Sequence, residues 1–419
     1  MGSTATTQDA SRSFCLHRPA VLWYNTAMRK IKIGLLPRLF LAIALGAAIG
    51  FFAPEWLLRS MNCFRDSFGQ FIKFFVPFII VGLVTPAIAD TGRAAGRTLL
   101  LTMGIAYAST LFAGYFAYGV SCGVFPAIMS GGLQDAATKA FPAYFVLRIP
   151  PMMDVTTALA ASFLIGLGII TSKAEILEKA AHELREIVAR ALEKAFVPLL
   201  PFYVLATMAD LTASGRLAVV GGGCLKIMGM ALATTTAVLL VQFTVAGIVA
   251  RRNPLKALWT MLPAYLTGWG CCSSAATIPY TLAQTRKNGV SEETADLVIP
   301  LCANVHLAGS MANMVVYAAG LAVLAGEALP FGAFTEYILM VSVTAVASPG
   351  VPGGVVLACA SVAEAALGFS PERYAIMIAV YMALDGMGTA CNLTGDGAIA
   401  IVVDRFRRRG ESSGGGANG

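Results

Sequence analysis

The stretch YMALDGMGTACNLTGDG, residues 381–397, places polar and acidic residues inside a long apolar run near the end of the chain. Asp385, Thr389, Asn392 and Asp396 follow one another at intervals of 4, 3 and 4, so an α-helix carries all of them on one face. A carboxylate in such a helix is costly unless it faces a cavity or a partner, and no Lys or Arg lies among these residues. We therefore predict a site for a hard cation such as sodium, in preference to a polar stripe that only joins packed helices.

The whole chain is poor in charge. Of its 419 residues, 57% are hydrophobic and 13% are charged, and the mean hydropathy is +0.73. Soluble domains carry about 25% charged residues. Continuous apolar runs of about 20 residues are typical of membrane-spanning helices, whereas the strands of a membrane barrel alternate with period two. Because lipid offers no hydrogen bonds to the backbone, we predict an all-α membrane protein.

Apolar segments divide the chain into predicted spans. Eight of them are continuous, at 36–53, 67–89, 98–125, 155–171, 196–212, 217–250, 293–325 and 373–403. Two more, at 257–285 and 331–368, are interrupted by Gly, Pro and Ser and are predicted to be re-entrant hairpins. Irregular backbone at membrane depth is tolerated only where protein buries it or it lines a cavity. Two interrupted segments in different parts of a membrane protein are typical of a transporter binding site.

The net charge of +7 does not indicate a nucleic-acid partner, because the basic residues lie in short clusters between the apolar segments. With the N-terminus inside, most of them fall on one side of the membrane, at 29–38, 93–97, 173–194, 251–256, 286–287 and 405–409. The other side holds only Arg59, Arg65, Lys139, Arg148, Arg216 and Arg373. By the positive-inside rule, we expect a multi-pass protein of the cell (inner) membrane with both termini in the cytoplasm.

Three further segments carry structural predictions. Residues 1–27 are polar and irregular and are predicted to be an upstream extension or a disordered tail, with Met28 as a natural start. Residues 406–419 are predicted to be a flexible tail. Residues 173–194 form an amphipathic helix, either on the cytoplasmic surface or as the solvated start of the next span, and we favour the second. Most of the nine cysteines lie in apolar segments, so we interpret them as small buried residues rather than disulfides.

Three motifs together resemble those of a known family. They are MLPAYLTGWGCCSSAATIPYT at 261–281, SPGVPGG at 348–354 and ALDGMGTACNLTGD at 383–396. In this order and spacing, the chain resembles the dicarboxylate/amino acid:cation symporters, the glutamate and neutral amino acid transporter family, from about residue 30 to 405. Its pattern is most similar to serine/threonine-type members. The resemblance implies inverted repeats, a homotrimer and an elevator mechanism, with 28–250 mainly scaffold and 251–405 the transport core.

The resemblance also implies roles for individual residues. Asp385 matches the acid that holds the substrate amino group, and Thr389 and Asn392 match polar substrate contacts. Asn392 and Asp396, with the backbone of Cys302, match sodium ligands. The remaining matches are the hairpin tips that hold the substrate carboxylate and gate the site: Ser273, Ser274, Val346, Ser348 and Gly350.

A glycine indicates which substrate the site accepts. Family members that take acidic substrates carry an arginine three residues after the position of Asp385, where this chain has Gly388. Without a guanidinium, a second substrate carboxylate has no bidentate partner. We therefore expect a small neutral amino acid, with an acidic amino acid or dicarboxylate as the alternative.

A second departure concerns ion coupling. In PLCANVHLAGSMANM, residues 300–314, His306 stands where the family has an asparagine and Ala308 where it has an aspartate, and both usual residues help to bind sodium. We expect fewer coupled sodium ions. His306 either carries a proton in place of a sodium ion or is a neutral hydrogen-bonded histidine, and we favour the neutral form. The pair Cys271–Cys272 also departs from the family pattern, and we interpret it as packing rather than as a reactive pair.

Two other classes of protein are alternatives to a symporter. A membrane hydrolase would use Ser273 or Ser274 with His306, but the sequence contains no nucleophile elbow. A channel is the second alternative. Concentrative uptake distinguishes a symporter from both, because neither an enzyme nor a channel accumulates its solute.

Overall fold

The computed structural model describes residues 35–93, 97–129, 141–346, 348 and 353–414. These residues contain helices and connections but no strand, so the prediction of an all-α protein is confirmed for them. The predicted extension at 1–27 lies outside the described residues.

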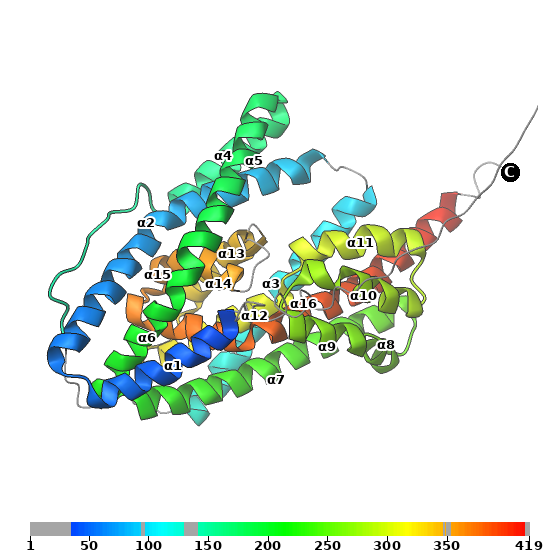
Figure 1. The fold of residues 1–419 in the computed structure, drawn as a ribbon. Helices are drawn as coiled ribbons and strands as arrows, with labels where there is room; N and C mark the ends of the chain where they lie inside the picture. Colours follow the sequence, from blue (N-terminus) through cyan, green and yellow to red (C-terminus); the bar gives the residue numbers. More distant parts are fainter. Residues whose placement is uncertain (1–34, 94–96, 130–140, 347, 349–352, 415–419) are drawn as a thin grey trace, which may run out of the picture. The chain divides into compact units, whose positions relative to one another are not determined.

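Most helices coincide with the apolar segments expected from the sequence (Figure 1). The first half of the chain contains α1 (Leu35–Phe52), α2 (Glu55–Arg93), α3 (Arg97–Ile128), α4 (Val155–Ser172), α5 (Glu175–Ala191), a π-helical turn η1 (Leu192–Phe196), α6 (Val197–Ala213) and α7 (Leu217–Ala250). The second half contains α8 (Pro254–Thr260), α9 (Leu262–Cys271), α10 (Ser274–Lys287), α11 (Glu292–Val305), α12 (Ala308–Leu324), α13 (Phe331–Val346), α14 (Gly354–Ala358), α15 (Ala360–Leu367) and α16 (Pro371–Gly414).

Several helices are long and apolar enough to cross a bilayer. Among the described residues there are five such spans, at Glu55–Asp90, Thr98–Ile128, Val220–Ala250, Glu292–Leu324 and Pro371–Arg408. The bent pair formed by α5 and α6 makes a sixth, and three further apolar helices are shorter. The structure thus contains several membrane-spanning helices, and the count of eight spans with two re-entrant hairpins stays a prediction.

The amphipathic segment at 173–194 runs directly into the next apolar helix. α5 continues through η1 into α6, with a bend of 46°. Such π-helical turns insert an extra residue into the helix and change its direction. This continuity agrees with the solvated start of a span that we favoured.

Both interrupted segments contain several short helices: α8, α9 and α10 in the first, and α13, α14 and α15 in the second. In the first, α9 ends where Cys272 adopts a left-handed conformation with φ 51°, and its N–H donates to the carbonyl of Gly268. In the second, Gly353 precedes α14 with φ 75°, a conformation that glycine adopts without strain. Whether each segment re-enters the membrane as a hairpin stays a prediction.

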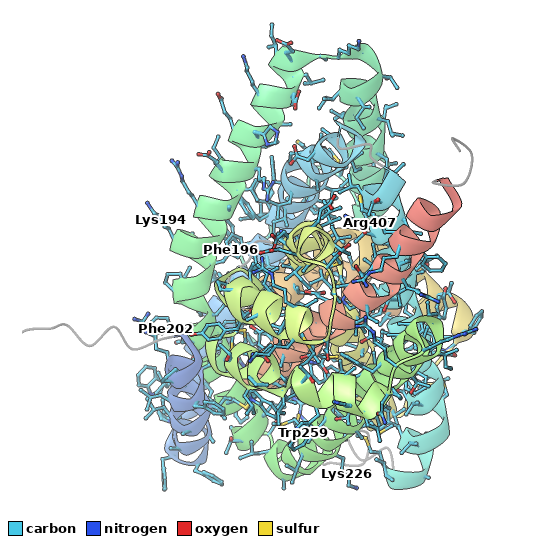
Figure 2. The ribbon with its side chains drawn as sticks, turned by 90° about the vertical axis from the view of Figure 1, so that its right-hand side faces the viewer. Lys194, Phe196, Phe202, Lys226, Trp259 and Arg407 are labelled. Atoms are coloured by element: carbon cyan, nitrogen blue, oxygen red, sulfur yellow. The ribbon has the colours of Figure 1, made fainter. Side chains whose placement is uncertain are left out.

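The centre of the fold is formed by α12 and α16, which pack side by side. They are surrounded by α3, α7, α9, α10 and α11, while α1 packs on α6 and α2 on α4. Nearly every residue of α12 is buried, so its polar side chains face protein rather than lipid. The periphery instead carries large apolar side chains such as Phe202 and Trp259, which are 60% and 74% exposed (Figure 2). An outer surface of this kind is suited to contact with lipid.

Basic residues predicted for one side of the membrane also meet in space. Arg65 and Arg216 both pair with Asp210, at 3.1 and 3.7 Å, and Arg216 also pairs with Glu372 at 2.9 Å. Asn62 donates to the same aspartate at 2.8 Å. The network thereby connects α2 and α6 to the start of α16, and its most buried pair is that of Arg65 with Asp210.

The opposite group of basic residues gathers at the turn between α10 and α11. Arg252 and Arg408 donate to the carbonyl of Gly289 at 3.1 and 3.3 Å, and Arg407 pairs with Glu293 at 2.6 Å. The alternation of the helices therefore agrees with the charge pattern of the sequence. The assignment of this end to the cytoplasm stays a prediction.

The last helix extends further than the sequence indicated. α16 continues to Gly414, so residues 406–414 of the predicted flexible tail are helical, and only 415–419 lie outside the described residues. Two arginines explain the extension, since Arg407 pairs with Glu293 and Arg408 pairs with Asp404 at 2.9 Å.

Candidate functional site

Breaks in three other parts of the chain converge on the middle of α16. A Cβ added at Gly386 would lie 2.2 Å from the carbonyl oxygen of Trp269, so the end of α9 contacts α16 there. A Cβ at Gly309 would lie 2.4 Å from Cβ of Cys391, so the start of α12 contacts the next turns of α16. The start of α14 reaches the same region through Gly353. Helix ends leave backbone N–H and C=O groups unpaired, so this convergence brings polar backbone into the centre of the protein.

Asp385 lies at the point of convergence. Its Oδ2 accepts a hydrogen bond of 2.8 Å from the N–H of Gly353, and the side chain is 8% exposed. Among the described residues, no Lys or Arg forms an ion pair with it. Tyr381 is a second, uncharged hydrogen-bond partner of this carboxylate. A buried carboxylate whose donors are all neutral retains its need for a cationic partner. The site can therefore bind a positively charged group, such as a substrate amine.

Asn392 connects α16 to the start of α12. Its Oδ1 accepts from the N–H groups of Gly309 and Ser310, at 2.7 and 3.2 Å, and its Nδ2 donates to the hydroxyl of Ser310 at 2.9 Å. The amide thus satisfies N–H groups at the start of a helix that has no side-chain cap of its own. In this arrangement Asn392 is bound to protein on both sides of its amide, while the sequence had indicated sodium and substrate as its partners.

Asp396 is bound by the imidazole that departs from the family pattern. His306 Nδ1 lies 2.9 Å from Asp396 Oδ1, and both side chains are at most 1% exposed. His306 Nε2 lies 3.1 Å from the hydroxyl of Ser109 and 3.2 Å from Nε2 of Gln242. His306 is the first of the two residues between α11 and α12, and its own N–H donates to the carbonyl of Cys302 at 2.8 Å. The three predicted sodium ligands are therefore brought around one helix break, with the imidazole among them.

The other predicted site residues lie on the same helix or at the breaks. Thr389 is 7% exposed and donates to the carbonyl of Asp385 at 3.2 Å. Ser273 and Ser274 are half-buried at the break between α9 and α10. Val346 ends α13, and the N–H of Ser348 donates to the carbonyl of Ala345. Gly350 lies outside the described residues.

Sequence reasoning missed three polar residues near these positions. Ser109 in α3 and Gln242 in α7 contact His306, and Asn313 in α12 lies beside Gly388. They could have been selected from the sequence because each one interrupts an otherwise apolar membrane segment, where a polar residue normally has a partner. Which partner each one contacts depends on packing between distant segments.

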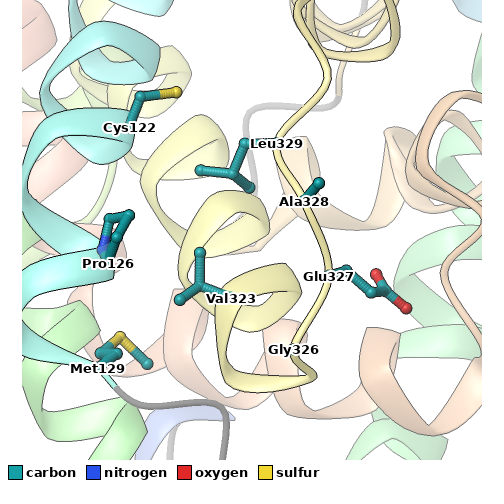
Figure 3. A pocket seen from close by; sticks show the side chains of 8 residues that line it. All are labelled: Cys122, Pro126, Met129, Val323, Gly326, Glu327, Ala328 and Leu329. Atoms are coloured by element: carbon teal, nitrogen blue, oxygen red, sulfur yellow. The ribbon is translucent and has the colours of Figure 1, made fainter.

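The pocket in Figure 3 is a weaker candidate. It has a volume of about 400 Å³ and lies between the ends of α3 and α12, lined by Cys122, Pro126, Met129, Val323, Gly326, Glu327, Ala328 and Leu329. Its one charged side chain, Glu327, already forms two hydrogen bonds of 2.7 Å with Arg373. It therefore offers a ligand mainly apolar contacts, unlike the buried acids of α16.

Comparison with known proteins identifies the family. The pattern of the sodium:dicarboxylate symporter family matches residues 35–406. The chain belongs to this family. The resemblance inferred from the three motifs is thereby confirmed. Since the family consists of transporters, the hydrolase alternative is rejected, although Ser109, His306 and Asp396 contact one another in the order of a catalytic triad.

Individual relatives cover different shares of the chain. The serine/threonine transporter of Streptococcus thermophilus (strain CNRZ 1066) is 22% identical over 396 residues, which are 90% of this chain and 97% of that protein. Neutral amino acid transporter B(0) of Mus musculus is 29% identical over 174 residues, 40% of this chain and 31% of that protein. The human B(0) transporter is 27% identical over 175 residues, 42% of this chain and 32% of that protein. The chain thus matches about a third of the length of the B(0) transporters.

Proposed function

We propose that this protein is a secondary-active symporter that imports a small neutral amino acid together with sodium by alternating access. The observation that carries the proposal is the pair of positions 385 and 388 on one face of α16. Asp385 offers a buried carboxylate for the substrate amino group, and Gly388 offers no positive charge for a second substrate carboxylate. The printed names of the relatives, serine/threonine and neutral amino acid transporters, agree with this substrate class.

Sodium is the proposed coupling ion, and it is cargo rather than a resident cofactor. The family is one of sodium symporters, and Asp396 supplies a carboxylate beside the helix break. A carboxylate has about four lone-pair sites, of which the imidazole of His306 takes one. We therefore expect that Asp396, Asn392 and the carbonyl of Cys302 hold sodium when the break rearranges. The alternative is that His306 carries a proton in place of the ion.

The larger organisation follows as part of the proposal. Residues 28–250 would form mainly a scaffold and 251–405 a transport core, in a homotrimer that works as an elevator in the cell (inner) membrane. Contacts of α3 and α7 with α12 and α16 support the expectation that the spans at 98–125 and 217–250 pack on the core.

Uptake into proteoliposomes tests the proposal. With an inward sodium gradient, we expect concentrative uptake of labelled L-serine and L-alanine but not of L-aspartate, and no uptake when choline replaces sodium. Concentrative uptake of aspartate alone would contradict the neutral substrate. Uptake that is independent of sodium but driven by a pH gradient would indicate proton coupling through His306.

A substitution at position 388 tests the substrate class directly. A Cβ at Gly388 would lie 3.0 Å from Nδ2 of Asn313, a side-chain amide that can yield by a few tenths of an ångström. We expect Gly388→Arg to take up L-aspartate and to lose L-serine uptake. Hydrogen bonds to charged groups contribute about 1.5–3 kcal/mol, which is about a 10- to 100-fold change in preference.

Competition between labelled serine and aspartate measures that preference. Gly388→Gln is the matched control, because it adds a long polar side chain without charge and is not expected to accept aspartate. If Gly388→Arg still prefers serine, position 388 does not set the substrate charge.

A further inference from the structure

One face of α12 carries three polar side chains, two of which have no hydrogen-bond partner among the described residues. Ser310, Asn313 and Tyr317 follow at intervals of three and four, so they lie on one face of the helix. This face meets α16, since Gly388 lies beside Asn313 and the rings of Tyr317 and Tyr381 meet edge to face at 6.1 Å. The polar face of α12 and the acidic face of α16 therefore border the same region.

Asn313 is buried without a partner for either atom of its amide. Its side chain is 1% exposed, and among the described residues neither Nδ2 nor Oδ1 has a hydrogen-bond partner. The hydroxyl of Tyr317, one turn further along, is also buried and unpartnered. Each buried polar group without a partner lowers the stability of the fold by about 1–3 kcal/mol. The side chains of Asn313 and Tyr317 are therefore destabilising in this arrangement.

The contrast with Asn392 shows that the lack of hydrogen-bond partners is particular to the position of Asn313. Asn392 is 3% exposed in the same helix pair, yet its amide accepts two N–H groups and donates to Ser310. The packing of α12 against α16 thus satisfies one buried asparagine and leaves the other unsatisfied. Buried polar groups without protein partners are commonly completed by water or by a ligand.

The position of the unsatisfied amide suggests what completes it. A Cβ at Gly388 would lie 3.0 Å from Asn313 Nδ2 and 3.5 Å from the hydroxyl of Ser310. Gly388 is three residues from Asp385, so the amide lies beside the face on which Asp385 would hold the substrate amino group. Three residues correspond to about 4.5 Å along the helix, so a substrate whose amino group pairs with Asp385 lies within reach of the Asn313 amide.

We infer that Asn313 is a specificity-determining residue that hydrogen-bonds the polar side chain of the substrate. This inference rests on the proposed function. A neutral amide offers both a donor and an acceptor, which complements a hydroxyl or a carboxamide and does not balance a carboxylate. The inference therefore predicts that the site prefers neutral amino acids with a hydroxyl or amide, such as L-serine, to aliphatic ones of similar size, such as L-alanine. Tyr317 provides a second hydroxyl on the same face.

The test compares serine with alanine in proteoliposomes under a sodium gradient. A site that hydrogen-bonds a substrate hydroxyl discriminates strongly against the analogue that lacks it. We expect the parent protein to prefer serine about 10-fold or more in kcat/KM, and Asn313→Leu, which keeps the shape of the side chain, to reduce that ratio to about 1. Alanine uptake should persist in Asn313→Leu, which shows that the variant is folded and active. Tyr317→Phe should reduce the ratio less.

The outcomes separate this inference from the proposed function. If the parent takes up no neutral amino acid with sodium, the proposed function fails. If it takes up both but does not distinguish serine from alanine, or if Asn313→Leu keeps the preference, water rather than substrate completes the amide and the inference is overturned. If Asn313→Leu is not recovered from membranes, Asn313→Ala provides the same comparison.

Discussion

Asp385→Asn should nearly abolish amino acid binding while leaving the fold intact. Asparagine has the shape of aspartate, and its Oδ1 can still accept the hydrogen bond from the N–H of Gly353. What it loses is the negative charge that would pair with the substrate ammonium. Breaking a buried ion pair by removing one partner costs about 3–5 kcal/mol, so we expect the affinity for L-serine to fall about 100-fold or more.

Equilibrium binding of labelled serine to the purified protein at saturating sodium measures this loss. Asp404→Asn is the matched control, because Asp404 is also a buried acid of α16 but is bound by Ser291 and Arg408 at the far end of the helix. It should leave serine affinity within a factor of a few. Unchanged affinity in Asp385→Asn, or an equal loss in Asp404→Asn, would refute the assignment of the amino group to Asp385.

Periodicity and composition were sufficient to predict the helices and the acidic face of α16. The eight apolar segments correspond to helices or helix pairs, and the breaks occur near Cys272 and Gly353, inside the stretches rich in Gly, Pro and Ser. These features are local, because a run of apolar residues or a cluster of helix breakers acts within its own segment. The end of α16 was missed, since its extension depends on ion pairs such as that of Arg407 with Glu293 in another helix.

The contacts within the site were less predictable because they join distant segments. Sequence spacing placed Asn392 and Asp396 on one face, but nothing local indicates that Asn392 binds the start of α12 or that His306, 90 residues away, binds Asp396. The same holds for Asn313, whose unsatisfied amide is visible only when α12 is packed on α16. Polar residues in apolar helices could be selected from the sequence, but their partners required the fold.

The contacts of His306 define the charge that remains for an ion at Asp396. With the Gln242 amide oriented so that its nitrogen faces Nε2, Nε2 accepts a hydrogen bond and the imidazole proton lies on Nδ1. In that tautomer the Nδ1–H of His306 donates to Asp396. A charged imidazolium would neutralise the carboxylate and remove its attraction for sodium. We therefore expect sodium rather than the proton to be the coupling ion.

Asp396→Asn should accordingly raise the sodium concentration needed for half-maximal serine uptake about 10-fold or more, which corresponds to the loss of about 1.4 kcal/mol of sodium binding. Serine affinity at saturating sodium should change far less, because Asp385 lies three turns away along α16. His306→Asn is the informative companion, since it removes the imidazole and leaves the carboxylate. It should keep the sodium requirement and show no new dependence on a pH gradient. Two results together would contradict this assignment. They are an unchanged sodium dependence in Asp396→Asn, and uptake that a pH gradient drives in the parent protein but not in His306→Asn. The imidazole would then carry a proton as the coupling ion, and Asp396 would only orient it.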